Sequence, residues 1–280
     1  MLVDRATGTM VRGMNDGAGN FEFADGLLGS QWKLHVADLN GDGKDDLLLT
    51  MPDFGFWFTL LNEGDGHFKS RAGSWVAAPS LTLGDFNGDR RSDAFLYDPE
   101  TGTWTTAFSD GAGDFTYVSG TTNTGSTVQR INVDGDARAD LLLYNPETGV
   151  WAEWASQNSG LDRRSLGEGG FTVRTGVWKA GLTVRAVDGT REGRDDVLLY
   201  DATSGEWTFV MIGKKTEYAT GVWHPGMTIA TGDLNGDRRT DLLLHDQTTG
   251  VWIKGLRRES GAFDFTSGQW DPGWLLALEP

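Results

Sequence analysis

An acidic segment of nine residues that recurs five times is the feature of this 280-residue sequence that most limits its fold. The copies are DLNGDGKDD from Asp38, DFNGDRRSD from Asp85, NVDGDARAD from Asn132, DGTREGRDD from Asp188 and DLNGDRRTD from Asp233, so their starts lie 47, 47, 56 and 45 residues apart. Self-similarity at such a period is typical of chains built from stacked copies of one supersecondary unit. We therefore expect a repeat architecture.

The remainder of each repeat indicates what that unit is. A short apolar run such as LLLT, AFLY or LLLY follows the acidic segment, then a turn such as DPETGT, then a tryptophan at a constant offset, then in most repeats a second glycine-rich turn. Short apolar runs separated by such turns are typical of strands, and about four strands fit in one repeat. A period of about 40 to 50 residues with four strands predicts an all-β fold, a β-propeller of four-stranded blades.

The two ends of the sequence indicate how many blades to expect. The N-terminal MLVDRATGTM aligns with AFLYDPETGTW, and the C-terminal SGQWDPGWLLALEP aligns with TGVWHPGMTIATGD. We therefore expect a single domain over residues 1–280, a six-bladed propeller closed by pairing of its N- and C-terminal strands. Its blades would be 28–74, 75–121, 122–177, 178–222, 223–269, and 270–280 plus 1–27. The alternative is an excerpt from a longer repeat array whose ring holds more blades.

The acidic segments have the spacing of a calcium-binding loop. Calcium takes six to eight oxygen ligands at about 2.3 to 2.6 Å, and a loop supplies them when alternate side chains point inward. The second copy would use the side chains of Asp85, Asn87, Asp89 and Asp93 and the backbone carbonyl of Arg91. An EF-hand would need a bidentate glutamate at position twelve, where the first copy has Leu49, so these loops are of another kind.

The five copies together predict four to five bound Ca²⁺ ions. The alternative is a set of Asx turns that bind no metal, because aspartate, asparagine and glycine favour turns in any case. The fourth copy departs most from the pattern, with threonine and glutamate at its third and fifth positions. The candidate ligands are Asp38, Asn40, Asp42, Lys44 and Asp46; Asp85, Asn87, Asp89, Arg91 and Asp93; Asn132, Asp134, Asp136, Arg138 and Asp140; Asp188, Thr190, Glu192, Arg194 and Asp196; and Asp233, Asn235, Asp237, Arg239 and Asp241.

The composition agrees with bound cations and argues against several partners. The five loops carry about three negative charges each and account for most of the formal net charge of -16, and bound cations would relieve their mutual repulsion. The same negative charge argues against nucleic acid, whose phosphates are bound by lysine and arginine. No run approaches the roughly 18 apolar residues of a membrane span, so we expect no membrane insertion. The sequence contains no cysteine, which excludes disulfides and thiolate metal sites.

With these motifs the sequence resembles the FG-GAP or VCBS-type repeats that form the blades of integrin α-subunit propellers and of many bacterial surface and secreted proteins. The loop residues match the family motif position by position, apart from Asn132, Thr190 and Glu192. The resemblance implies calcium in the hairpin between the first and second strands of each blade. It also implies ligand binding at the opposite face of the ring or in the crevices between blades. Proteins of this family serve in adhesion, as lectins, as accessory modules of polysaccharide-degrading enzymes and as scaffolds.

Catalytic motifs give no support for an enzyme. The sequence contains no G-x-S-x-G, no H-E-x-x-H, no phosphate loop and no cysteine nucleophile. A pair of carboxylates acting as in a glycosidase stays possible among so many acidic residues. We therefore expect a protein that is not an enzyme.

Recognition of a ligand is the expected function. The tryptophans that close four of the repeats, Trp75, Trp178, Trp223 and Trp270, are candidates for stacking on sugar rings, or else they fill the wedges between blades. We predict a calcium-stabilised, non-catalytic module that recognises a glycan, acting as a monomer or within a larger chain. The alternatives are a protein-binding adhesion scaffold and, third, an accessory or catalytic domain of a polysaccharide-degrading enzyme. Because free calcium is scarce in the cytosol, we expect the protein to be extracellular, on the cell surface or periplasmic.

Overall fold

The computed structural model of the chain is all-β. It describes the backbone of residues 2–3, 9–15 and 21–27, residues 31–64, 67–157, 170–187, 193–211, 216–237 and 239–274, the backbone of residue 188, and residue 276. Within these residues no helix is long and apolar enough to span a membrane. The sequence-based expectation of an all-β fold is confirmed.

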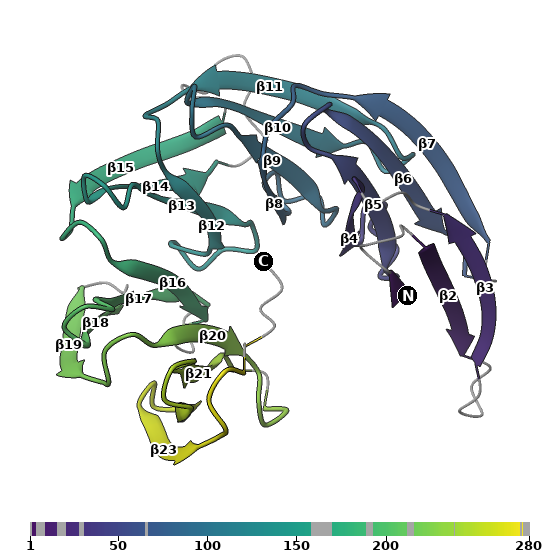
Figure 1. The fold of residues 1–280 in the computed structure, drawn as a ribbon. Coiled ribbons are helices and arrows are strands. Elements are labelled where there is room, and N and C mark those ends of the chain that lie inside the picture. The colour runs from purple at the N-terminus through teal and green to yellow at the C-terminus, as the bar shows by residue number, and fades with distance from the viewer. Residues whose placement is uncertain are drawn as a thin grey trace. The chain divides into compact units, whose positions relative to one another are not determined.

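Each repeat forms one antiparallel sheet whose strands follow one another in sequence order (Figure 1). Five sheets have four strands and one has three, β1–β3. The strands of the three-stranded sheet are β1 (Leu2–Val3), β2 (Thr9–Asn15) and β3 (Phe21–Leu27). The first strands of the four-stranded sheets are β4 (Lys33–Ala37), β8 (Ser80–Gly84), β12 (Thr127–Ile131), β16 (Thr183–Asp188) and β20 (Thr228–Gly232). The second strands are β5 (Asp46–Met51), β9 (Asp93–Tyr97), β13 (Asp140–Tyr144), β17 (Asp195–Tyr200) and β21 (Asp241–His245). The third strands are β6 (Phe56–Asn62), β10 (Thr103–Ser109), β14 (Val150–Ser156), β18 (Glu206–Met211) and β22 (Val251–Arg257). The fourth strands are β7 (Phe68–Ser74), β11 (Phe115–Thr121), β15 (Phe171–Val177), β19 (Glu217–Val222) and β23 (Phe263–Gln269).

The chain divides into two compact units, residues 1–124 and 125–280. The first unit holds the sheets β1–β3, β4–β7 and β8–β11, and the second holds β12–β15, β16–β19 and β20–β23. Each four-stranded sheet lies within one predicted repeat. The number of blades and the closure of a ring stay predictions.

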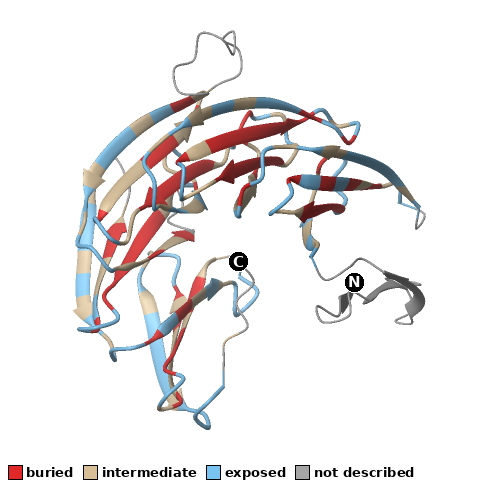
Figure 2. Ribbon diagram, turned by 45° about the horizontal axis from the view of Figure 1, so that its top comes forward, coloured by how far each residue is buried: buried red, intermediate tan, exposed pale blue. Residues whose placement is uncertain are grey.

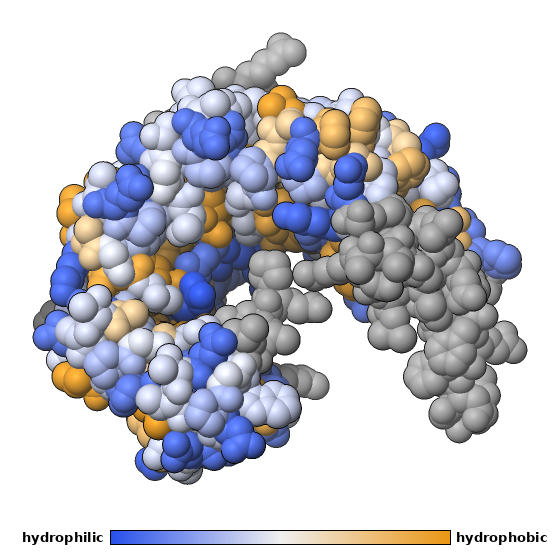
Figure 3. All heavy atoms as spheres, in the orientation of Figure 1, coloured by the Kyte–Doolittle hydropathy of each residue, from blue (hydrophilic) through white to orange (hydrophobic). Residues whose placement is uncertain are grey.

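Burial is concentrated on the second strand of each four-stranded sheet (Figure 2). All five residues of β9 and of β13 are buried, whereas most of β7 and β23 is exposed. A strand buried on both faces requires apolar side chains throughout, and this explains runs such as DAFLY and DLLLY. On the face of the molecule shown in Figure 3, hydrophilic side chains predominate and hydrophobic ones form small patches.

Consecutive sheets within each compact unit share apolar cores. In the first unit Leu48 and Trp57 of one sheet cluster with Ala94, Ala107 and Phe115 of the next. In the second unit one cluster joins β12–β15 to β16–β19, and another joins β16–β19 to β20–β23. Because these clusters join residues of adjacent sheets, the repeats within each unit stabilise one another through contacts between neighbouring sheets, as expected for stacked repeats.

A tryptophan on each third strand covers a glycine on the fourth. The paired residues are Trp57 and Gly73, Trp104 and Gly120, Trp151 and Gly176, Trp207 and Gly221, and Trp252 and Gly268. A Cβ atom on any of these glycines would lie 2.3–2.6 Å from the indole ring, closer than real Cβ atoms approach. The glycine two residues before each closing position is therefore required by the tryptophan. This pairing of a tryptophan with a glycine is not among the features predicted from the sequence.

We predict that Gly221→Ala destabilises the fold by about 1 to 3 kcal/mol, because the added methyl group meets the Trp207 ring and forces the packing apart. The ring has little room to shift, since it stacks on Trp223 with centroids 4.9 Å apart. Gly232→Ala is the matched control, because a Cβ there meets nothing within 4 Å. Urea denaturation of both variants measures the effect, and equal stability of the two would contradict the packing argument.

Candidate functional site

Each acidic loop that the structure describes joins the first and second strands of its sheet. The aspartate at position nine of the loop is the first residue of the second strand in four of the repeats. These four residues, Asp46, Asp93, Asp140 and Asp241, are all 0% exposed. The most acidic segments of the chain therefore each place one carboxylate in the protein interior.

The buried carboxylate accepts hydrogen bonds from two separate parts of the backbone. In the second repeat Asp93 Oδ2 accepts from the N–H of Phe86, at 3.0 Å, and Oδ1 accepts from the N–H of Ser109, at 2.9 Å. The first donor belongs to the start of the loop and the second to the end of the third strand. The other three repeats use the same arrangement, with donors Leu39 and Asn62 for Asp46, Val133 and Ser156 for Asp140, and Leu234 and Arg257 for Asp241.

Burial changes the acidity of these groups. Removal from water raises the pKa of Asp93 to about 7 and that of Asp140 to about 6, against the lowering effect of the two backbone donors. It also raises the pKa of Asp46. Neighbouring loop carboxylates add to the effect; for Asp93 they are Asp89 and Asp85. A positive charge close to these groups would favour their ionised forms.

The remaining acidic positions fold the loop onto its own backbone. Asp85 Oδ1 accepts from the N–H of Gly88 at 2.7 Å, and its Oδ2 accepts from the N–H of Arg90 at 2.8 Å. Asn87 Oδ1 accepts from the N–H of Asp89 at 2.9 Å, and Asp89 Oδ1 from the N–H of Arg91 at 3.0 Å. This is the geometry of successive Asx turns.

The basic residue at position seven forms an ion pair with the acidic residue at position five. The N···O distances are 2.9 Å for Lys44 and Asp42, 2.5 Å for Arg91 and Asp89, and 2.8 Å for Arg239 and Asp237. Arg138 pairs with Asp136 in the same way. From the sequence, position seven was expected to contribute only its backbone carbonyl, and the ion pair formed by its side chain was not predicted. One oxygen of the position-five carboxylate therefore already contacts a cation within the loop.

The donor set of these loops fits calcium in kind, because it consists of carboxylate, amide and carbonyl oxygens. In the part of the chain that the structure describes, no three acidic or histidine side chains form a group that could hold a metal ion. A bound calcium ion would have to compete with the basic side chain at position seven for the position-five carboxylate. Calcium binding by these residues thus stays a prediction, and so does the alternative of metal-free Asx turns.

The fourth acidic loop differs from the others in the partner of its position-nine carboxylate. Thr190 and Glu192 and the side chain of Asp188 lie outside the described residues. Asp196, at position nine, forms an ion pair with Arg257 of the neighbouring sheet at 2.5 Å, and both side chains are 2% exposed. This loop obtains a cation from the next repeat.

All four closing tryptophans contact aromatic residues of other strands, and Trp270 does so with Trp252 of its own sheet, with ring centroids 5.7 Å apart. Trp75 packs with Phe115 of the next sheet, with ring centroids 5.5 Å apart, and Trp223 packs with Phe265 of the next sheet at 5.8 Å. Trp178 stacks on Trp151 of its own sheet at 5.1 Å. Trp75, Trp178 and Trp223 are half-buried. These contacts are those expected of residues that fill the wedges between sheets.

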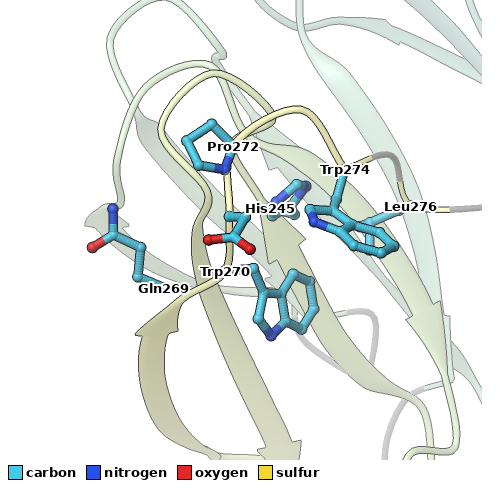
Figure 4. Close-up of a pocket in the computed structure, with 7 residues that line it drawn as sticks. His245, Gln269, Trp270, Pro272, Trp274 and Leu276 are labelled. Carbon is cyan, nitrogen blue, oxygen red and sulfur yellow. The ribbon is translucent and has the colours of Figure 1, made fainter.

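Trp270 differs from the other closing tryptophans in being 41% exposed. It lines an open cavity of about 770 Å³ at the end of the sheet where β21 and β23 end (Figure 4). We call this the Trp270 cavity. Its lining consists of His245, Gln269, Trp270, Asp271, Pro272, Trp274 and Leu276. Trp274 is 64% exposed, so the cavity presents two indole rings to solvent. The amide of Gln269 points away from both rings (Figure 4) and donates to the backbone carbonyl of Thr249 at 3.0 Å.

Comparison with known proteins gives a match to one family model over part of the chain and similarity to several solved structures. The family model for FG-GAP-like repeats matches residues 38–96. A lectin from Agrocybe aegerita that recognises non-reducing terminal N-acetylglucosamine has a similar structure, with a TM-score of 0.66 and 13% identity over 92% of this chain and 73% of that one. A functionally unknown protein from Desulfotomaculum acetoxidans has a TM-score of 0.58 and 10% identity, over 97% of this chain and 81% of that one. A protein from Lactobacillus plantarum has a TM-score of 0.57 and 10% identity, over 94% and 79% of the two chains. A comparison with curated protein sequences gives no match.

Proposed function

We propose that this chain, an FG-GAP-type repeat propeller, is a non-catalytic carbohydrate-recognition module whose binding site is the Trp270 cavity. The observation that carries the proposal is the exposure of Trp270 and Trp274 side by side in one cavity that Asp271 also lines. Flat aromatic rings suit the apolar C–H face of a sugar, while carboxylate and amide groups suit its hydroxyls. Ligand sites of proteins commonly combine a largely apolar lining with a few such polar groups.

The size of the cavity and the fold support the same proposal. A volume of about 770 Å³ lies within the range of about 300 to 1,000 Å³ that is usual for ligand pockets. The similarity to a lectin that recognises N-acetylglucosamine is a similarity of fold, and it is compatible with a propeller that binds carbohydrate. We further propose that the module works outside the cytoplasm, on the cell surface, in the periplasm or as a secreted protein.

We predict that Trp270→Ala and Trp274→Ala each weaken glycan binding at least tenfold, which corresponds to about 1.4 kcal/mol. The physical reason is the loss of an aromatic surface for the sugar ring. Binding is measured first on a glycan array and then by calorimetry with the best ligand. Tyr218→Ala is the control, because Tyr218 is also an exposed aromatic residue, at 67%, but does not line the cavity.

Two outcomes would replace this proposal by another. An array on which the wild-type protein binds no glycan would favour a protein-binding adhesion scaffold. Release of reducing ends from a polysaccharide would favour a polysaccharide-degrading enzyme.

We also propose that the loops of the first, second, third and fifth repeats bind calcium and are stabilised by it. Their aspartate and asparagine side chains at positions one, three, five and nine, with the carbonyl at position seven, would hold the ion. Support comes from the oxygen-only donor set, the net charge of -16, and the raised pKa values of Asp93 and Asp140. Calcium would supply the positive charge that lets these buried carboxylates ionise.

The calcium proposal predicts a particular pH dependence. In EDTA the native protein should hold protons on Asp93 and Asp140 up to a pH of about 7 and about 6, whereas the unfolded chain releases them near pH 3.9. The free energy of unfolding should therefore fall as the pH rises from 5.5 to 7.5, by at most about 1.4 kcal/mol per pH unit and group. Calcium at a hundred times its dissociation constant should add about 2.7 kcal/mol at pH 7.5. Coincident denaturation curves in EDTA and calcium at pH 7.5 would refute calcium binding by the native state.

We propose, finally, that the propeller has six blades and that it is closed by pairing of its N- and C-terminal strands. The three-stranded sheet supports this, because its register Met10 to Gly26 and Asn15 to Phe21 repeats the register Trp57 to Gly73 and Asn62 to Phe68. The sheet thus has the register of the second, third and fourth strands of a blade, and its first strand would come from the C-terminus.

Blade closure predicts the effect of joining the two ends of the chain through a loop copied from DLNGDRRTD. In a six-bladed ring the joined protein should melt at a higher temperature than the open one, because the link reduces the entropy of the unfolded chain. A joined protein with the same or a lower melting temperature would support a fragment of a larger ring. A link of equal length made of glycine and serine is the control for the loop sequence.

A further inference from the structure

Asp271 is the charged group that the Trp270 cavity presents to solvent. Of the other polar side chains in the lining, His245 is buried, at 1% exposure, and the amide of Gln269 is bonded to the backbone of Thr249. Asp271 itself is exposed, and its carboxylate forms no ion pair or hydrogen bond with the described residues. A ligand in the cavity therefore meets one full negative charge.

The position of Asp271, directly after the closing tryptophan, carries a basic residue in two other repeats. Lys179 occupies it in one of them and forms an ion pair with Asp201. His224 occupies it in the next, and its Nδ1 lies 3.5 Å from Oδ2 of Asp246. Asp271 thus removes a positive charge from this position of the repeat and puts a negative charge in its place.

The surroundings of the cavity carry the same sign of charge. No lysine or arginine of the described structure lines the cavity, and the chain as a whole has a formal net charge of -16. At physiological ionic strength such charges act over about 8 Å, so they attract a cation that enters the cavity and repel an anion. Sugars that carry a carboxylate are therefore excluded.

The two exposed indole rings also favour a cation. Trp270 is 41% exposed and Trp274 is 64% exposed, and both rings line the cavity (Figure 4). The face of an aromatic ring is negative, so it attracts an ammonium group within about 6 Å of the ring centre. At an exposed ring this attraction increases affinity by about two- to fivefold. Rings that stack on a sugar can thus also bind an ammonium group attached to that sugar.

We infer that the Trp270 cavity binds a sugar with a protonated amino group, which pairs with the carboxylate of Asp271 and lies against the indole rings. This inference rests on the proposed carbohydrate-binding function. Hydrogen bonds between two charged groups are about twice as strong as those between neutral groups. A neutral sugar keeps the stacking contact and lacks the ion pair, so it binds the same cavity more weakly.

The test compares sugars that differ in one group. Calorimetry at about pH 6, where the amine is protonated, measures the affinities of methyl glucosaminide, methyl glucoside and methyl N-acetylglucosaminide. We expect the glucosaminide to bind at least fivefold more tightly than the two neutral sugars. Raising the salt concentration from about 0.05 M to about 1 M should reduce this preference, because salt screens an exposed ion pair.

Two variants of Asp271 test the ion pair directly. Asp271→Asn removes the charge with little change in shape, and it should abolish the preference for the glucosaminide while leaving the affinity for the glucoside within about twofold. Asp271→Lys introduces the residue found at 179 and should lower the affinity for the glucosaminide at least tenfold. Because Asp271 is exposed, both variants should melt at the wild-type temperature. Asp53→Asn is the matched control, since Asp53 is also exposed and does not line the cavity.

The outcomes separate this inference from the proposed function. If the wild type binds the glucoside and Trp270→Ala does not, but the glucosaminide is not preferred or Asp271→Asn keeps the preference, the ion pair is refuted and the carbohydrate site stands. If the wild type binds no sugar, both proposals fail. Tetramethylammonium that binds as tightly as the glucosaminide would show that the sugar ring contributes nothing, which would overturn the carbohydrate function.

Discussion

The buried carboxylate at position nine of each acidic loop is the interaction on which the rest of the structure depends. A single side chain accepts from an N–H group seven residues earlier and from another sixteen residues later. It thereby joins the loop, the second strand and the third strand at one point. Because both donors are backbone groups, the neighbouring side chains are free to vary from leucine to phenylalanine and from serine to arginine.

Such a carboxylate needs compensation for its removal from water, and the chain provides it in more than one way. Two backbone donors supply part of it, yet the pKa of Asp93 still rises to about 7. Lysine or arginine at position seven brings a positive charge into the loop next to the position-five carboxylate. In the fourth repeat Arg257 reaches Asp196 from the neighbouring sheet. The acidic and basic residues of the loops therefore belong to one electrostatic arrangement, and calcium would add to it.

The sequence predicts the regular parts of the fold well, because a contact that recurs in every repeat leaves a periodic signal. The apolar run after each acidic loop predicts the buried second strand, and the turn residues predict its end. The direction of the Arg91 side chain leaves no such signal, since spacing gives a residue's place in the loop and not what its long side chain contacts. The exposure of Trp270 could not be predicted from the sequence either. Trp178 and Trp223 occupy the same position of their repeats as Trp270 and differ from it only in what packs on them.

The departures from the repeat are therefore more informative about function than the repeat itself. The tyrosines at the end of the second strand, Tyr144 and Tyr200, donate their hydroxyls to backbone carbonyls at the start of the next repeat. In the fifth repeat this position is occupied by His245, and Trp274, four residues after the closing Trp270, is exposed. Both residues line the Trp270 cavity. A ligand that covers the indole rings of Trp270 and Trp274 would remove from water apolar surface that the fold leaves exposed.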